Sequence, residues 1–384
     1  MRKIYQSVLL LIMVLGIATF YTSCTKDDDK IKSTGEPRIN YIRITDPLSS
    51  DSLLVSAGQG SLIAIIGENL QDANEIWFND QKAVLTPTYI TNTSILVSVP
   101  LEVPKEITNK LTIIFASGKT VEHDFKLEIS EPLISGMSSE YVQKGDLATI
   151  KGNFFYEPLT VTFTGGVIGQ IETLEDDMIK VRVPDGALPG QITVKTNFGE
   201  TKSDFMFRDN RNIFISSDPF TGWWNASYVV SAPGADDPAK INGNYIRVKK
   251  LVNAWAWTEI AGGAADAMGP ISKNIPDDAI LKPENYNLKF EVNTKKPYTS
   301  NQIKINVGLL KENNDAYKWN PPIDTKGAWQ TIVIPFNEVT KSYGAPLSVS
   351  PTGYWTRLMM HGPGDLDADI SFDNFRVVPK IIKK

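Results

Sequence analysis

Apolar and polar residues alternate in short runs along most of the chain, and turn residues separate these runs. In residues 288–292 and 303–309 every second residue is apolar, which leaves Lys304 and Asn306 on the face opposite the apolar one. Such alternation predicts β-strands with one face against a core. No ten-residue stretch stands out with a helical period, so the pattern predicts an all-β protein.

The C-terminal part of the chain, residues 209–384, contains seven segments of this kind. They are residues 245–248, 254–260, 288–292, 303–309, 329–334, 355–360 and 370–378. Strands in this number and spacing predict a jelly-roll β-sandwich of two sheets.

The first half of the chain contains an internal repeat of about 85 residues. A Gly–Asn segment occurs at 67–70 and again at 152–154, and each copy is followed by a strand that ends in Phe and a strand that ends in Val-Pro. Each copy then closes with a strand pair around a Gly turn. The pairs are 111–115 with 121–125 and 192–196 with 205–207. This spacing of strands and turns predicts two antiparallel sandwiches.

These two units resemble IPT/TIG immunoglobulin-like domains in their length and in the order of their motifs. The resemblance covers residues 37–130 and 131–208, and Pro37 and Pro132 open the two units as that family would. It implies that both domains are spacers. Trp77 is predicted to lie in the core of the first.

Composition excludes several classes of function. A formal net charge of −5 argues against a nucleic-acid partner, which would require a basic face. Two histidines and one cysteine make a His- or Cys-based metal site improbable, and no cofactor is expected. The triplet Asp365, Asp367 and Asp369 suggests calcium, but it lacks the Gly and Glu of an EF-hand loop, so a solvated turn is favoured.

The N-terminus has the pattern of an export signal. Residues 1–23 combine Arg2-Lys3 with an apolar stretch at 8–18 and small residues before Cys24. The end of this segment resembles a bacterial lipobox, with Tyr21 where Leu is usual, and implies lipidation of Cys24. The Lys-plus-acidic run after Cys24 resembles a surface-export signal of Bacteroidota lipoproteins; an ordinary linker is the alternative. Residues 24–36 are predicted to tether a surface-exposed protein to the cell outer membrane.

Seven of the eight tryptophans lie in residues 209–384. Exposed indoles flanked by Gly, Asn and Glu usually contact a flat ligand, and a sugar ring is the commonest. If 254–260 is a strand, its period of two places Trp255, Trp257 and Glu259 on one face, where two indoles beside a carboxylate form a sugar platform. The alternative is that Trp257 packs inward at a bulge and only Trp255 is exposed.

Of the remaining indoles, Trp329 is expected to be structural at the start of a strand, and the others occur in adjacent aromatic pairs or in a loop. Of the pair Trp223-Trp224 we expect Trp224 to be the free member, and Tyr354-Trp355 has the same ambiguity. Trp319 is expected in a loop at the rim of a site. The predicted glycan-binding residues are Trp224, Trp255, Trp257, Glu259 and Trp355.

Taken together, the tether, the tandem IPT units and the closing strand 370–378 resemble the surface glycan-binding protein B family of Bacteroidota polysaccharide-utilisation systems. The resemblance implies a C-terminal domain similar to the xyloglucan-binding module and no catalysis. It implies a polysaccharide of the β-glucan type as ligand. It also implies an outer-membrane transporter complex and a companion surface glycan-binding protein as partners.

Two other functions remain open from the residues alone. A surface glycoside hydrolase or lyase would require two carboxylates about 5–9.5 Å apart, and Glu259 with Asp236 or Glu291 could supply them. An adhesin would use the tryptophan face as a hot spot for a host protein.

Overall fold

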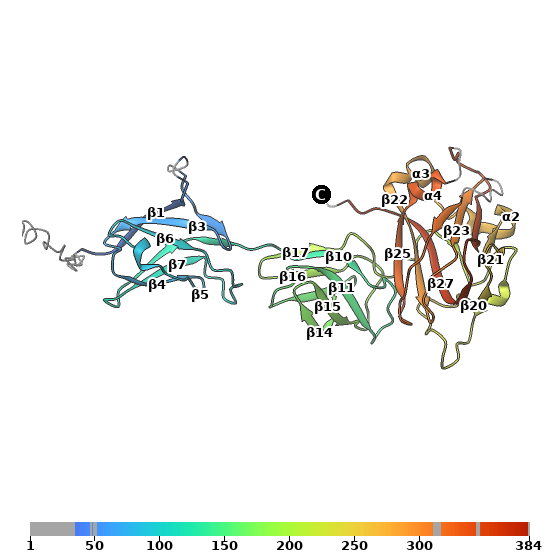
Figure 1. The fold of residues 1–384 in the computed structure, drawn as a ribbon, viewed down its shortest axis with the longest axis horizontal. Helices are drawn as coiled ribbons and strands as arrows, with labels where there is room; N and C mark the ends of the chain where they lie inside the picture. Colours follow the sequence, from blue (N-terminus) through green and yellow to red (C-terminus); the bar gives the residue numbers. More distant parts are fainter. Residues whose placement is uncertain (1–34, 47, 49–51, 310–315, 343–345, 383–384) are drawn as a thin grey trace, which may run out of the picture. The chain divides into compact units, whose positions relative to one another are not determined.

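The structure is a computed structural model that describes residues 35–46, 48, 52–309, 316–342 and 346–382 (Figure 1). The predicted signal segment 1–23 and Cys24 lie outside the described residues. The described chain is all-β, as predicted, and it divides into two units, Met1–Ile129 and Ser130–Lys384. Among the described residues, no helix is long and apolar enough to cross a membrane.

The first unit is a sandwich of two antiparallel sheets. One sheet has the order β1-β3-β6 and the other β5-β4-β7-β8, while β2 and β9 form a parallel pair. The strands are β1 (Arg38–Ile44), β2 (Ser56–Gly58), β3 (Leu62–Glu68), β4 (Ala73–Phe78), β5 (Gln81–Lys82), β6 (Ser94–Ser98), β7 (Lys110–Phe115), β8 (Thr120–Asp124) and β9 (Lys126–Glu128), with a 3-10 turn η2 (Pro87–Tyr89). Alternate residues such as Ile65, Phe78 and Ile113 fill the core.

One indole of this unit was wrongly predicted. Ile76 and Phe78 of β4 point into the core, so Trp77 between them lies on the outer face of its sheet. Its indole donates to Glu75 Oε2 at 2.9 Å and lies under the Lys82 ammonium.

The second sandwich repeats the sheet order of the first, with β10-β11-β15-β14 in one sheet and β13-β12-β16-β17 in the other. Its strands are β10 (Leu133–Met137), β11 (Leu147–Asn153), β12 (Thr160–Phe163), β13 (Val167–Ile168), β14 (Gln170–Glu175), β15 (Met178–Arg182), β16 (Thr193–Thr196) and β17 (Gly199–Lys202). The prediction of a strand at 205–207 was wrong. Gly199–Lys202 pairs with β16, and Phe205 and Phe207 are core side chains outside the named strands.

The repeated glycine of the motif has a steric cause. A Cβ at Gly67 would lie 2.1 Å from the Arg38 carbonyl oxygen, and one at Gly152 would lie 1.9 Å from the Leu133 carbonyl oxygen. At both places the preceding strand carries an irregularity in its pairing and approaches the glycine closely. The same close backbone contact therefore occurs in both domains, and it accounts for the glycine that the two repeats share.

The C-terminal domain packs two larger sheets around one core. The first sheet has the order β19-β20-β27-β22-β25, with β18 also paired to β27, and the second has the order β21-β26-β23-β24. The strands are β18 (Ile213–Ile215), β19 (Val229–Val230), β20 (Tyr245–Val252), β21 (Thr258–Gly263), β22 (Tyr286–Thr294), β23 (Ile303–Gly308), β24 (Tyr317–Trp319), β25 (Gln330–Pro335), β26 (Trp355–Met360) and β27 (Leu366–Pro379). The helices are short: α2 (Ala265–Met268), α3 (Asp277–Leu281), α4 (Phe336–Lys341), and the 3-10 turns η3 (Ala226–Tyr228), η4 (Gly269–Lys273) and η5 (Pro283–Asn285).

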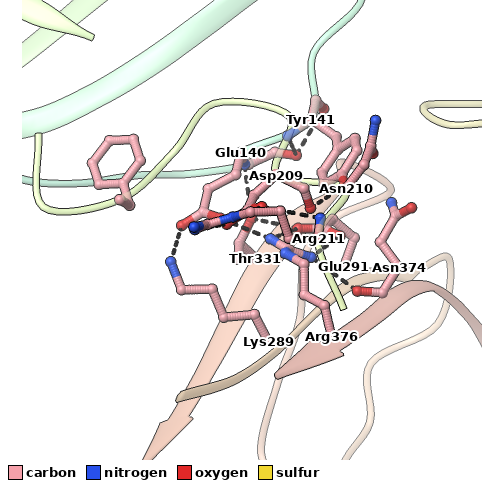
Figure 2. A network of polar contacts seen from close by, with 12 residues as sticks. Glu140, Tyr141, Asp209, Asn210, Arg211, Lys289, Glu291, Thr331, Asn374 and Arg376 are labelled. Atoms are coloured by element: carbon pink, nitrogen blue, oxygen red, sulfur yellow. Dashed lines mark hydrogen bonds and ion pairs between the residues drawn. The ribbon is translucent and has the colours of Figure 1, made fainter. Parts of the chain in front are cut away.

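A buried polar network joins the second sandwich to the C-terminal domain (Figure 2). Arg376 of β27 binds Glu291 of β22 at 2.9 Å and Glu140 of the second sandwich at 2.7 Å. Lys289 binds the other oxygen of Glu140 at 2.6 Å, and Thr331 donates to Glu291 at 2.9 Å. In this network the two cations Arg376 and Lys289 are paired with the two carboxylates Glu140 and Glu291.

Candidate functional site

The sheet β21-β26-β23-β24 has one face against the core and one facing outward. Ile303, Ile305 and Leu358 lie in the core, so the intervening residues of these strands face outward. The register places Glu259, Met359, Lys304 and Lys318 in one row across the outer face. Arg357 and Asn306 form the next row. The two rows are the polar base of the site.

Three tryptophans pack edge to face at one end of this sheet. The Trp223 ring lies 5.1 Å from the Trp355 ring and 5.8 Å from the Trp224 ring, and Trp224 lies 6.0 Å from Trp355. Trp355 is the first residue of β26 and is buried, whereas Trp223 is 55% exposed. The buried indole therefore supports the exposed one.

Close contact between two glycines holds the Trp223 loop against β21. Gly222 forms a parallel bridge with Gly262, and the Trp223 amide donates to the Gly262 carbonyl at 2.9 Å. A Cβ at Gly222 (φ 111°) would lie 2.5 Å from that carbonyl oxygen. Only glycine fits there, so the position of Trp223 depends on it.

A second aromatic group lies around the turn that precedes β21. Trp257 stacks on His361 with 3.9 Å between ring centroids and an interplanar angle of 17°, and Trp255 meets the edge of the same imidazole at 5.6 Å. Trp255 is 58% exposed and Trp257 is 53% exposed. His361 covers part of Trp257, and about half of that side chain's surface remains open to a ligand.

Arg357 connects the two aromatic groups. Its guanidinium lies 5.5 Å from the Trp224 ring and 5.3 Å from the Trp257 ring. The Glu259 carboxylate holds it through two hydrogen bonds, of which Arg357 Nε to Glu259 Oε2 measures 2.9 Å. We call the exposed indoles Trp223, Trp255 and Trp257, together with Trp224 and Trp355 that lie behind Trp223, the tryptophan surface.

The structure corrects the predicted basis of this site in one respect. The strand begins at Thr258, not at residue 254, and Trp255 sits in a turn with φ of 60°. The Trp255 amide donates to Gly362 and the Ala254 amide to Asp365, and these contacts pull the chain out of the strand. Both indoles are nevertheless exposed.

Other predicted residues also differ in role. Trp223, not Trp224, is the exposed member of its pair, because Trp224 is partly covered between Trp355 and Arg357. Glu259, predicted to bind the glycan, forms an ion pair with Arg357. Trp319 belongs to β24 and packs on Phe290 of the core rather than at a rim.

Four polar side chains of the site were not assigned from the sequence: Arg357, His361, Lys304 and Asn306. The alternation in 303–309 already placed Lys304 and Asn306 away from the core, and this was the signal available. Burial, followed by the charge of Lys304, lowers the pKa of His361 below its usual value, so the imidazole that stacks on Trp257 is neutral at pH 7.

Of the candidate catalytic carboxylates, Glu259 and Glu291 do not both reach this surface as free acids. Glu291 is fully buried in the network with Arg376, and Glu259 is paired with Arg357. The candidate calcium ligands are also engaged separately, Asp367 by Lys296 and Asp369 by Arg247. No group of three His, Cys, Asp or Glu that could hold a metal occurs among the described residues.

Comparison with known proteins identifies the domain that carries this surface. Residues 207–379 match the family model described as the surface glycan-binding protein B xyloglucan-binding domain. The C-terminal domain is therefore similar to this family along nearly its whole length. A Bacteroides ovatus protein described as IPT/TIG domain-containing is 29% identical over 167 residues. That match covers 41% of this chain and about a third, 33%, of the relative's length.

Solved structures share the fold along most of the chain. The surface glycan-binding protein PbSGBP-B from Prevotella bryantii aligns with a TM-score of 0.66 at 24% identity, over 90% of this chain and 99% of that one. A crystal structure with a xylogluco-oligosaccharide aligns with a TM-score of 0.50 at 18% identity, over 90% of this chain and 100% of that one. The domain thus follows a β-rich architecture seen by experiment.

Proposed function

We propose that the protein binds a polysaccharide through the tryptophan surface of its C-terminal domain and does not cleave it. The observation that carries this proposal is the set of three exposed indoles, Trp223, Trp255 and Trp257, around a paired Arg357–Glu259. An indole presents a flat apolar face to the C–H side of a pyranose, while nearby polar groups bind the hydroxyls.

The match of residues 207–379 to a xyloglucan-binding domain family supports a ligand of the β-glucan type. The pairing of Glu259 and the burial of Glu291 support binding without hydrolysis, since glycoside hydrolysis needs two carboxylates that both reach the glycosidic bond. We further propose the cellular setting implied by the sequence. In that setting Cys24 carries a lipid, the protein faces outward from the outer membrane, and it delivers polysaccharide to a neighbouring transporter complex alongside a companion binding protein.

Calorimetry with the chain from residue 25 onward tests the binding. Xyloglucan, mixed-linkage glucan and β-1,3-glucan form the panel, and release of reducing sugar is measured in parallel. Trp257→Ala and Trp255→Ala are each expected to weaken binding about 10-fold or more, the loss typical of a central aromatic contact. Tyr89→Ala, an exposed aromatic of the first unit, is the matched control and should bind normally.

The alternatives give different results. Release of sugar would show an enzyme. Unchanged binding in both tryptophan variants would place the site elsewhere. Protection of the protein from protease added to intact cells would contradict the proposed surface location.

A further inference from the structure

Lys304 lies under the tryptophan surface, and none of the residues that the structure describes provides it with a counter-ion. It belongs to β23, between the core residues Ile303 and Ile305, so its side chain is on the outer face of the sheet. Its ammonium is 5.9 Å from the centroid of the Trp257 ring. Lys304 is only 6% exposed.

Among the described residues, no carboxylate or carbonyl oxygen accepts a hydrogen bond from the Lys304 ammonium. Glu259 is the acid in the same row of the sheet, and Arg357 occupies both of its oxygens. Lysines with so little exposed surface are normally paired, so an ammonium that no described residue pairs is unusual.

The surrounding charges disfavour this ammonium. Lys318 is directly opposite Lys304 in the register of β23 and β24, and like charges placed directly opposite across two strands destabilise a sheet. Burial, then Lys318 and Arg357, lowers the pKa of Lys304. His361, neutral at pH 7, brings no compensating negative charge. Among the described residues of this row, two lysines stand beside one acid, and that acid is bound to Arg357.

We propose that Lys304 binds the carboxylate of an acidic sugar residue, a uronic acid, on the polysaccharide that stacks on Trp257. A sugar hydroxyl could accept a hydrogen bond from this ammonium but would leave the excess charge in place. A carboxylate supplies both the acceptor and the missing negative charge. This inference rests on the proposed function and adds a substrate class to it: a glycan with uronic acid substituents rather than a wholly neutral one.

The test uses the chain from residue 25 onward and pairs of polysaccharides that differ only in the carboxyl group. Glucuronoxylan and polygalacturonan are each compared with the same polymer after carboxyl reduction, and xyloglucan is a neutral reference. We expect at least one acidic polymer to bind about 10–100-fold more tightly than its reduced form, the usual contribution of a hydrogen bond to a charged group. Lys304→Met should abolish this preference and Lys304→Arg should preserve most of it, while Lys318→Met, at an exposed position, should reduce it only slightly.

Lys304→Met has a second expected effect that requires no ligand. Removal of an unpaired buried charge should raise the Tm of the free protein, and this also shows that the variant folds. Equal binding of the acidic and reduced polymers by the wild-type protein, with retained binding of xyloglucan, would overturn the uronic acid proposal and leave the proposed function intact. Equal weakening of acidic and neutral polymers in Lys304→Met would assign Lys304 to a hydroxyl and overturn it as well. Failure of every polymer to bind would overturn both.

Discussion

Replacement of Arg376 by Met tests whether the buried network holds the second sandwich and the C-terminal domain together. The Arg376 guanidinium is 0% exposed and reaches Glu140 from one domain and Glu291 from the other. Burial alone would lower its pKa, but Glu291 and Glu140 outweigh that effect and raise it, so the charge is firmly held. Met fills a similar volume but leaves Glu291 with the Thr331 hydroxyl as its remaining partner.

The expected loss of stability follows from the Glu291 carboxylate, which Arg376→Met leaves without a counter-ion. Removal of one partner from a buried ion pair costs about 3–5 kcal/mol, because the remaining carboxylate is buried without a counter-ion. For a unit of this size the corresponding fall in Tm is roughly 6–20 °C. Lowering the pH toward 5 should reduce the difference in Tm between Arg376→Met and wild type, because protonation neutralises the unpaired carboxylate. Burial already raises the pKa of Glu291, which favours its protonation.

Differential scanning calorimetry of the wild-type and Arg376→Met chains measures this change. Arg38→Met is the matched control, because Arg38 pairs with Glu68 on the exposed surface of the first unit and such pairs contribute little. We also expect the second sandwich and the C-terminal domain to melt together in the wild type and separately in Arg376→Met. A Tm for Arg376→Met within 2 °C of wild type would refute the argument.

Two further predictions concern buried groups of the C-terminal domain. Burial, and then the charge of Glu291, raises the pKa of Asp373 well above its usual value. Stability should therefore fall as the pH rises from the unfolded pKa of about 4 through the higher folded value, and Asp373→Asn should raise Tm at pH 7 but not below about pH 4. Trp355→Ala should destabilise the domain by about 3–5 kcal/mol in urea titrations, because it removes a buried indole beneath Trp223. Trp223→Ala should weaken glycan binding at unchanged Tm; equal stability loss in both variants would contradict the distinction.

The strands could be predicted because each sheet has one face in the core. In β22 and β23 the apolar side chains that alternate in the sequence are those that fill the core of the C-terminal domain. The internal repeat could be recognised in the sequence because a steric requirement recurs in both domains. The close contact at Gly67 and Gly152 admits only glycine, so the same motif stands at both places in the sequence.

The turn at Trp255 could not be predicted from local pattern. Two tryptophans spaced by two, followed by a real strand, look like the start of that strand. The backbone is instead fixed by the Gly362 carbonyl and the Asp365 carboxylate, more than a hundred residues away along the chain. The choice between Trp223 and Trp224 had the same limit, since it depends on where Trp355 and Arg357 lie.

The charged groups around Arg376 and those around Lys304 differ in how far they are paired, and this difference distinguishes a structural role from a binding role. Arg376 and Lys289 are paired with Glu140 and Glu291, so two carboxylates balance these two cations. Around Lys304 the described residues supply a neighbouring cation, Lys318, and no free acid. Arg376 and Lys304 are both buried residues, so burial alone cannot explain the difference. A structural cluster is selected to be complete within the folded chain, whereas a binding cluster is completed by its ligand. The unmatched ammonium beneath Trp257 fits the second description, which is why Lys304→Met should gain stability and lose selectivity at once.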